Sequence, residues 1–239
     1  MAKIVITSDS TTDLGAALQQ QYDIKILPLG VVLGDKLYTD GVDITPDDIY
    51  AHHDKTGELP KTNASNVENC LEFFRPFTDA GDTVIHFTIS SEMSSNYNNA
   101  RIAADELGNV FVIDNLEYLY KGGRCSALAM FGANLLKLKP CIQVKDGKMD
   151  VRKKFRGKFD AVLREYIDEQ LSDPDDLVTD RVFITHAGCD PQLVSSLREY
   201  VESRGIFKEV FVTRAGCTVS SHCGANTLGI LFIRKSPLK

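Results

Sequence analysis

The sequence lacks the motifs that mark the common nucleotide-binding and hydrolytic sites. It contains no G-x-x-x-x-G-K-[ST] phosphate-binding loop and no G-x-G-x-x-G dinucleotide fingerprint. It also contains no G-x-S-x-G elbow, the turn that presents the nucleophilic serine of α/β-hydrolases. These absences argue against the familiar nucleotide sites and against the best-known type of serine hydrolase.

Cysteine is present but follows no pattern. The 6 cysteines form no C-x-x-C pair and show no Cys/His spacing typical of a metal site. A zinc site built from His222, Cys217 and Cys223 lacks the usual ligand spacing. We therefore expect no metal and no other cofactor, and a cytoplasmic protein whose thiols stay reduced.

Long apolar runs and an excess of positive charge are also missing. No run approaches the roughly 18 apolar residues of a membrane span, and Met1-Ala2-Lys3 leads directly into a predicted strand, so we expect neither a span nor a signal peptide. The formal net charge of -6 argues against a nucleic-acid partner. The one basic stretch, Arg152–Lys158, fits either a solvated face or a docking patch for an acidic partner.

What is present is a soluble α/β pattern. The chain of 239 residues has 43% hydrophobic and 25% charged residues, and strand-like runs alternate with helix-like stretches. We predict a mostly parallel sheet in an N-terminal domain, residues 1–115, and a smaller α/β domain over residues 116–239. The junction is abrupt, because a helix begins at Leu116 almost directly after the strand Val110–Ile113, and a parallel return needs a dozen or more residues.

Residue patterns predict individual elements. Expected strands are Lys3–Thr7, Lys25–Val32, Thr83–Ile89, Val110–Ile113, Arg181–Thr185, Glu209–Val212 and Leu228–Ile233, with a hairpin of Cys141–Val144 and Lys148–Val151. Expected helices are Leu14–Tyr22, Tyr97–Leu107, Ala127–Leu138, Phe159–Leu171 and Pro191–Ser203, with further helix starts at Thr45 and at Ser65.

Three clusters of small polar residues each follow a predicted strand. They are Ser8–Asp13, Ser90–Asn96 and Gly216–Gly224. A buried strand that ends in a hydroxyl-rich turn and opens a helix offers hydroxyl donors and free backbone N–H groups to an anion. A phosphate usually recruits Arg or Lys, and none lies inside these clusters, so a singly charged carboxylate fits better than a phosphate.

The same residues leave two other functions open. Ser94 or Ser221 with His222 or His86, and Asp9 or Asp114, would supply the residue types of a catalytic triad. That hypothesis describes a serine hydrolase acting on acyl esters, and the simpler interpretation of these serines is helix caps and turn hydroxyls. The second alternative is a regulatory module that binds a phosphorylated ligand.

Segments along nearly the whole chain resemble the DegV family of bacterial lipid-binding proteins. They are Ser8-Asp-Ser-Thr-Thr-Asp13, Pro28-Leu29, Tyr38-Thr-Asp-Gly41, Lys61-Thr-Asn-Ala-Ser65, Ser90-Ser-Glu-Met-Ser-Ser95, Leu116-Glu-Tyr-Leu-Tyr-Lys-Gly-Gly-Arg124, and Lys139-Pro140 with Asp146-Gly-Lys148. No single segment is specific, but their order and spacing together are.

The resemblance implies a two-domain α/β protein that holds one long-chain fatty acid, such as palmitate, between its domains. By match of motif, Thr62 and Ser94 bind the carboxylate, Ser95 lies beside it, and His222 contributes through water. The protein is then no enzyme by itself. A separate fatty-acid kinase phosphorylates the bound acid for phospholipid synthesis, Arg124 is the candidate docking residue, and any contact with a membrane is transient.

An acyl tunnel is the second part of this expectation. Leu128, Phe131 and Leu135 recur at helical spacing in the predicted helix Ala127–Leu138 and are candidates to line it, although ordinary core packing explains each of them as well. Burying about fifteen methylenes gains roughly 12 kcal/mol before the costs of association. The tail therefore supplies affinity and the hydroxyls fix orientation.

The chain departs from the family pattern in two places that matter. The family usually has Gly-Thr where this chain has Ser95-Asn96. About forty residues that the family places before Leu116 are missing, which matches the abrupt junction. The gap is either a true deletion, which removes a helix and a strand, or a disordered segment left out of the chain.

Overall fold

The structure is a computed structural model that describes residues 2–114, 138–145 and 148–236. The N-terminal domain is built on a parallel sheet with the strand order β2-β1-β6-β7. Its strands are β1 (Ile4–Asp9), β2 (Lys25–Leu27), β6 (Thr83–Thr88) and β7 (Val110–Asp114). Its helices are α1 (Ala16–Gln21), α3 (Val67–Asp79) and α4 (Asn96–Leu107). The parallel sheet confirms the predicted class, and the strands end together at one edge.

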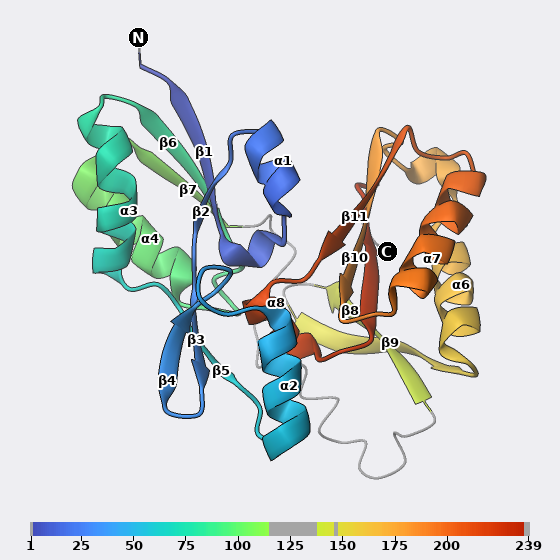
Figure 1. Ribbon diagram of the computed structural model, residues 1–239. Coiled ribbons are helices and arrows are strands. Elements are labelled where there is room, and N and C mark those ends of the chain that lie inside the picture. The colour runs from blue at the N-terminus through green and yellow to red at the C-terminus, as the bar shows by residue number, and fades with distance from the viewer. Residues whose placement is uncertain (1, 115–137, 146–147, 237–239) are drawn as a thin grey trace.

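Helices α3 and α4 cover one face of this sheet, and α1 lies on the other side (Figure 1). The core between the sheet and the two helices contains Phe74, Val84, Ala100 and Ala103, all fully buried. Small alanines in α4 let the helix pack closely against the sheet.

A second, antiparallel sheet is formed by the part of the chain between β2 and β6. It has the order β4-β3-β5 and consists of β3 (Gly30–Leu33), β4 (Lys36–Thr39) and β5 (Lys61–Asn63). Helix α2 (Pro46–Thr56) lies between β4 and β5 in the chain. The prediction of one strand over Lys25–Val32 was therefore wrong. Pro28 has no N–H to donate to a sheet, and the Leu29 N–H bonds the Ser10 hydroxyl instead (3.2 Å), so the chain leaves one sheet and enters the other.

The two predicted helix starts have different outcomes. Thr45 caps α2, as predicted, and Thr45 and Asp48 also form a capping box. At α3 the box joins Asn66 and Asn69, one residue later than the predicted start at Ser65. Ser65 does not act as the cap, because its backbone N–H and C=O are both bound by side chains of α4.

The C-terminal half contains a three-stranded sheet of order β11-β10-β12, with α6 and α7 on one face (Figure 1). Its elements are α6 (Phe159–Gln170), β10 (Arg181–Ala187), α7 (Pro191–Ser203), β11 (Glu209–Arg214) and β12 (Thr227–Leu231), with a short 3-10 turn at Pro174–Asp176 (η3). In the N-terminal half, a 3-10 turn at Ser10–Thr12 (η1) follows β1. The predicted hairpin is present and longer than expected, as β8 (Leu138–Lys145) and β9 (Lys148–Arg156). The predicted helix Ala127–Leu138 lies outside the described residues, except that Leu138 begins β8.

Helix α8 (Cys217–Cys223) joins the two halves. It follows β11 and precedes β12 of the C-terminal sheet, yet it packs against α2, β3 and β5 of the N-terminal half (Figure 1). The cluster predicted as a turn before a helix is thus itself the helix. The predicted boundary between residues 115 and 116 borders an undescribed stretch and stays a prediction.

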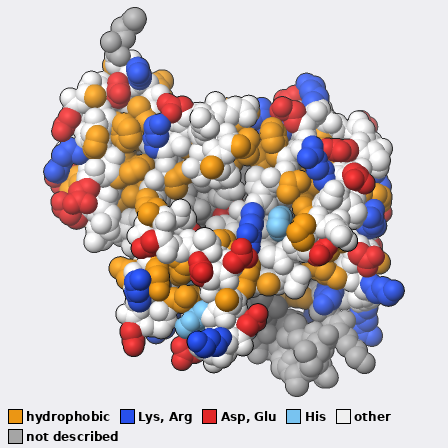
Figure 2. Space-filling model, in the orientation of Figure 1, with side chains coloured by type: hydrophobic (Ala, Val, Ile, Leu, Met, Phe, Trp, Pro, Cys, Tyr) orange, Lys and Arg blue, Asp and Glu red, His pale blue; other side chains and the backbone are white. Residues whose placement is uncertain are grey.

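Basic and acidic side chains are interspersed on the face shown in Figure 2. In the basic stretch on β9, the Lys153 ammonium pairs with Glu165 (3.2 Å) and with Glu169, while Arg152 and Arg156 are exposed. None of the helices in the described part of the chain is long and apolar enough to cross a membrane.

Candidate functional site

Two of the residues predicted to bind a carboxylate touch each other, although they come from opposite halves of the chain. Strand β5 places Thr62, and α8 places His222. The Thr62 hydroxyl and the His222 Nε2 are 2.9 Å apart, within hydrogen-bonding distance. Thr62 is half-buried and His222 is exposed, so the pair lies where a ligand can reach it.

Ser94 and Ser95 lie in the loop after β6. The Ser90 carbonyl accepts from the N–H groups of Met93 (2.9 Å) and Ser94 (3.1 Å), which curls the loop into a tight turn. The Ser94 hydroxyl accepts from the Asn96 N–H at 3.2 Å and keeps its own proton to donate. Ser95 is exposed and makes no capping bond to α4.

Side chains of α4 connect the Ser94 loop to the segment that carries Thr62. The Asn96 carboxamide oxygen accepts from the Ser65 N–H (3.2 Å), and the Asn99 carboxamide donates to the Ser65 carbonyl (2.8 Å). Since Ser65 follows Thr62 by three residues, the two hydroxyls predicted to share a carboxylate belong to neighbouring, mutually bonded segments. His222 joins them through Thr62.

The first polar cluster has a different role from the one predicted. Asp9 is fully buried, and its carboxylate accepts from the Ile89 N–H (2.7 Å), the Asn96 carboxamide (2.7 Å) and the Thr11 N–H (3.0 Å). Burial raises its pKa, and these hydrogen bonds oppose the increase. These three donors are thus occupied within the protein. Through Ile89 and Asn96, Asp9 holds both ends of the second polar cluster, Ser90–Asn96, in place.

Two carboxylates of the N-terminal half occupy the N-terminus of α8. Asp13 accepts from the Gly216 N–H (2.8 Å), and Asp40 accepts from the N–H groups of Cys217 (2.8 Å) and Thr218 (2.9 Å). The prediction that this end of the third cluster offers free N–H groups to an anion was wrong for these three groups. They bind protein carboxylates and are not available to a ligand anion.

Burial raises the pKa of Asp13 to about 7, with the nearby Asp40 and Asp9 adding to the effect and the Gly216 N–H opposing it. An unfolded aspartate has a pKa of about 3.9. Between about pH 4 and pH 7 the folded chain therefore keeps a proton that the unfolded chain loses. It follows that the free energy of unfolding contributed by Asp13 falls as the pH rises through this window.

Replacing Asp13 with asparagine tests this assignment. The carboxamide oxygen introduced at position 13 can still accept from Gly216, but the new side chain carries no charge. We expect D13N to exceed the wild type in free energy of unfolding by about 2 kcal/mol at pH 8, and by little at pH 5. Urea unfolding of both proteins at the two pH values measures the difference. A difference independent of pH would contradict the pKa assignment.

Three of the residues named for a catalytic triad, Asp9, His86 and Ser221, are engaged in structural hydrogen bonds. His86 is fully buried, its Nδ1 is 2.8 Å from the Thr7 hydroxyl, and burial lowers its pKa to about 4. The Ser221 hydroxyl donates to the Cys217 carbonyl (2.8 Å) inside α8. Burial raises the pKa of Cys217 to about 12, and its thiol donates to the Ile44 carbonyl, so it is a poor zinc ligand.

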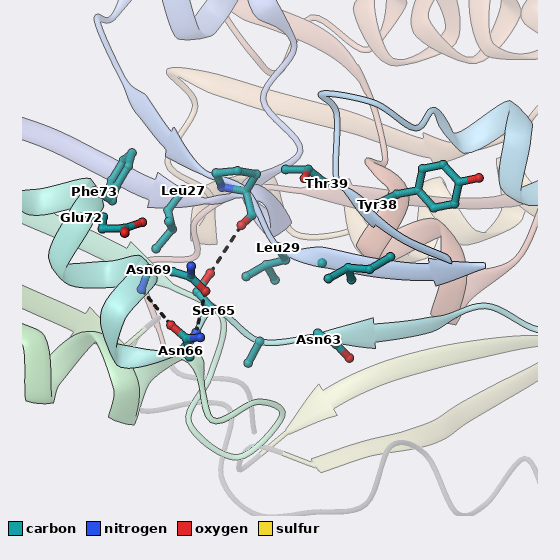
Figure 3. A pocket seen from close by; sticks show the side chains of 14 residues that line it. Leu27, Leu29, Tyr38, Thr39, Asn63, Ser65, Asn66, Asn69, Glu72 and Phe73 are labelled. Carbon is teal, nitrogen blue, oxygen red and sulfur yellow. Dashed lines mark hydrogen bonds between the residues drawn. The ribbon is translucent and has the colours of Figure 1, made fainter. Parts of the chain in front are cut away.

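A groove of about 550 Å³ lies on the other side of β5 (Figure 3). Leu27, Leu29, Tyr38 and Phe73 are among its lining residues, together with Asn63. Successive residues of a strand point to opposite faces, so Asn63 faces the groove while Thr62 faces His222. The sequence did not predict this groove, since its walls come from both sheets and from α3.

An apolar sheet face was also missed. Residues of β10 and β12 such as Val182 and Ile230 belong to the core with α6 and α7. Their neighbours Phe183, Phe211 and Leu231 lie on the opposite face, where the two phenyl rings stack at 5.2 Å and Leu231 is 52% exposed. The sequence contained a signal for this face, because β10 and β11 carry apolar residues at successive positions, which point to both faces of the sheet.

The remaining site residues expected from the sequence fall in a part of the chain that the structure does not describe. The tunnel candidates Leu128, Phe131 and Leu135 and the docking candidate Arg124 lie outside the described residues. Among the residues that the structure describes, no group of three or more His, Cys, Asp or Glu side chains could hold a metal ion.

Fold and site together define a two-domain α/β protein with a hydroxyl-lined site at the contact between its halves. Residues 3–115 and 108–235 match the family described as "Uncharacterised protein, DegV family COG1307". These segments cover most of the chain, which therefore belongs to the DegV family.

Relatives and solved structures agree with this assignment. A DegV domain-containing protein of Caldanaerobacter subterraneus is 26% identical, over 98% of this chain and 100% of its own. A protein of Thermotoga maritima named fatty acid-binding protein is 26% identical, over 95% of this chain and 96% of its own. A structure from Thermus thermophilus, described as showing fatty acid binding of a DegV family protein, is 26% identical, with a TM-score of 0.83, and covers 95% of this chain and 98% of that one.

The comparisons also bear on the abrupt junction. The alignment with the Caldanaerobacter protein is 286 residues long, whereas this chain has 239 residues. The two family matches overlap at residues 108–115, where the predicted gap lies. The alignment is longer than this chain, so the Caldanaerobacter protein has residues that this chain lacks.

Proposed function

We propose that this protein binds a single long-chain fatty acid, with its carboxylate at Thr62, Ser94 and His222. The observation that carries the proposal is the 2.9 Å contact between Thr62 and His222 beside a loop that presents the Ser94 hydroxyl. Ser95 lies at the exposed side of the same loop. The family membership and the relatives named for fatty acid binding support the ligand class.

The donors suit a carboxylate better than a phosphate. Ser94 offers one hydroxyl proton. Thr62 offers a second when the His222 Nε2–H donates to the Thr62 oxygen, and His222 then orients the Thr62 hydroxyl toward the ligand. Neutral donors satisfy one negative charge, and a carboxylate left unpaired in a partly buried site is costly. Asp9, Asp13 and Asp40 each accept hydrogen bonds from protein donors, so they act as supports and not as ligands.

The apolar face of the C-terminal sheet is a candidate surface for the acyl chain. Phe183, Phe211 and Leu231 present an apolar surface that α6 and α7 do not cover. Each buried methylene stabilises the complex by about 0.8 kcal/mol. A dissociation constant between micromolar and nanomolar is therefore expected after the costs of association.

The proposal includes presentation of the acid to a separate kinase, for use in phospholipid synthesis. His222 and Ser95 are exposed, so the carboxylate end faces solvent while the tail is covered. A phosphoryl donor bound to another protein can then approach the headgroup. In this role the protein is a carrier and catalyses no reaction by itself.

Mass spectrometry of the purified protein tests the ligand class. Mild denaturation is expected to release a C14–C18 fatty acid, and protein stripped of lipid is expected to bind palmitate in a calorimetric titration. Absence of any lipid, together with no binding of palmitate or oleate, would contradict the proposal. Labelling by a fluorophosphonate would favour the hydrolase instead, and stronger binding of a phosphorylated metabolite than of palmitate would favour the regulatory module.

A further inference from the structure

We propose that Asn96 is a positioning residue, which sets the separation between the Thr62 and Ser94 hydroxyls and so determines affinity for the ligand's carboxylate. This inference rests on the proposed function. Asn96 is the first residue of α4 and is fully buried, so its position is fixed by the helix and the sheet beneath it.

The side chain and backbone of Asn96 bond to the two segments that carry the Thr62 and Ser94 hydroxyls, and to Asp9. Its carboxamide oxygen accepts from the Ser65 N–H (3.2 Å), in the segment that carries Thr62. Its carboxamide nitrogen donates to Asp9 (2.7 Å) at the end of β1. Its backbone N–H donates to the Ser94 hydroxyl (3.2 Å). One residue therefore contacts the first polar cluster, the Thr62 segment and the Ser94 hydroxyl.

The chemistry of these partners requires both a donor and an acceptor at position 96. The Asp9 carboxylate can only accept, and the Ser65 N–H can only donate. An amide satisfies both at once and can be oriented in only one way. A leucine of similar size satisfies neither and leaves the buried Ser65 N–H without this partner.

A second asparagine acts on the same segment from one turn further along α4. The Asn99 carboxamide donates to the Ser65 carbonyl at 2.8 Å, and Asn99 is half-buried. Residues three apart lie on the same face of a helix. Ser65, three residues after Thr62, is thus held at its backbone N–H by Asn96 and at its backbone carbonyl by Asn99. Asn98, between them, is exposed.

The effect is on preorganisation. Hydroxyls that are held in place before the ligand arrives lose little freedom on binding, whereas hydroxyls on a less firmly held segment must be ordered by the ligand. This loss of preorganisation affects binding of the carboxylate headgroup and not binding of the acyl chain. Loss of Asn96 is therefore expected to weaken binding of a fatty acid and to leave binding of its methyl ester, which lacks the charged carboxylate, almost unchanged.

Binding of palmitate and methyl palmitate to Asn96→Leu, with Asn98→Leu as the matched control, tests the inference. We expect the dissociation constant for palmitate to rise about tenfold or more in Asn96→Leu, that for methyl palmitate to change less than about threefold, and Asn98→Leu to match the wild type. Equal affinity of Asn96→Leu and wild type for palmitate, or equal losses for acid and ester, would overturn it. A wild type that does not bind palmitate would instead reject the proposed function.

Two further variants apply if Asn96→Leu fails to fold. Asn96→Thr supplies a hydroxyl that can accept from Ser65 and donate to Asp9, and it is expected to keep palmitate affinity within about threefold of the wild type. Asn99→Ala removes only the half-buried contact and is expected to weaken palmitate binding about threefold, with no change for the ester. Unchanged palmitate affinity in Asn99→Ala, or a loss in Asn96→Thr shared by acid and ester, would overturn the inference.

Discussion

Replacing Asp40 with alanine is expected to lower the free energy of unfolding by about 3–5 kcal/mol, a large effect for a single substitution. The Asp40 side chain is 5% exposed and accepts from the Cys217 and Thr218 N–H groups, the Thr218 hydroxyl (2.6 Å) and the Ser10 hydroxyl (2.9 Å). Alanine leaves these buried donors without an acceptor. Urea unfolding followed by circular dichroism measures the loss.

Asp35 provides the control. It is an exposed aspartate in the turn between β3 and β4, so D35A is expected to stay within about 0.5 kcal/mol of the wild type. Because Asp40 holds the helix that carries His222, D40A is also expected to weaken palmitate binding. A loss of stability in D40A no larger than that in D35A would show that Asp40 does not hold α8.

The double variant T62A/S94A is expected to bind palmitate at least about 100-fold more weakly than the wild type. Each hydroxyl donates one hydrogen bond to a charged carboxylate, and such bonds are worth about 1.5–3 kcal/mol each. Calorimetric titration of lipid-free protein measures this effect. The melting temperature without ligand is expected to change little, since neither hydroxyl lies in the hydrophobic core.

A double variant of hydroxyls outside the site controls for the loss of two side-chain oxygens. Thr78 and Ser203 each donate to a backbone carbonyl of their own helix, and T78A/S203A is expected to bind palmitate like the wild type. If T62A/S94A binds palmitate as tightly as the wild type, the carboxylate does not bind at Thr62 and Ser94. The two double variants are expected to bind methyl palmitate with similar affinity, because the ester carries no charge.

Local chemistry accounts for most elements that were predicted correctly. The Thr45 cap and the helix Pro191–Ser203 were predicted at their observed positions, because caps and apolar spacing depend on a few adjacent residues. The strand interrupted at Pro28 and the one-residue shift of the cap at α3 were wrong. In both cases a distant partner decided the outcome, Ser10 for Leu29 and Asn96 for Ser65.

The site shows the same division. The sequence indicated Thr62, Ser94, Ser95 and His222 through a family resemblance, and the structure brings Thr62 to His222 across 160 positions of sequence. Sequence reasoning missed Asp40 and Asn96 as supports for the site. Aspartate and asparagine are common in surface turns and caps, and nothing in one sequence tells a buried polar side chain from an exposed one.

The sequence alone determined the α/β class, the DegV membership and the residue types available for holding a carboxylate. These follow from periodicity, from capping residues and from the order of short motifs, all of which are local. The tertiary structure decided which polar groups are free and which are already used. Asp9, Asp13 and Asp40 became structural supports because folding buried them against N–H donors of other segments, and a hydrogen bond between distant residues exists only once the chain is folded.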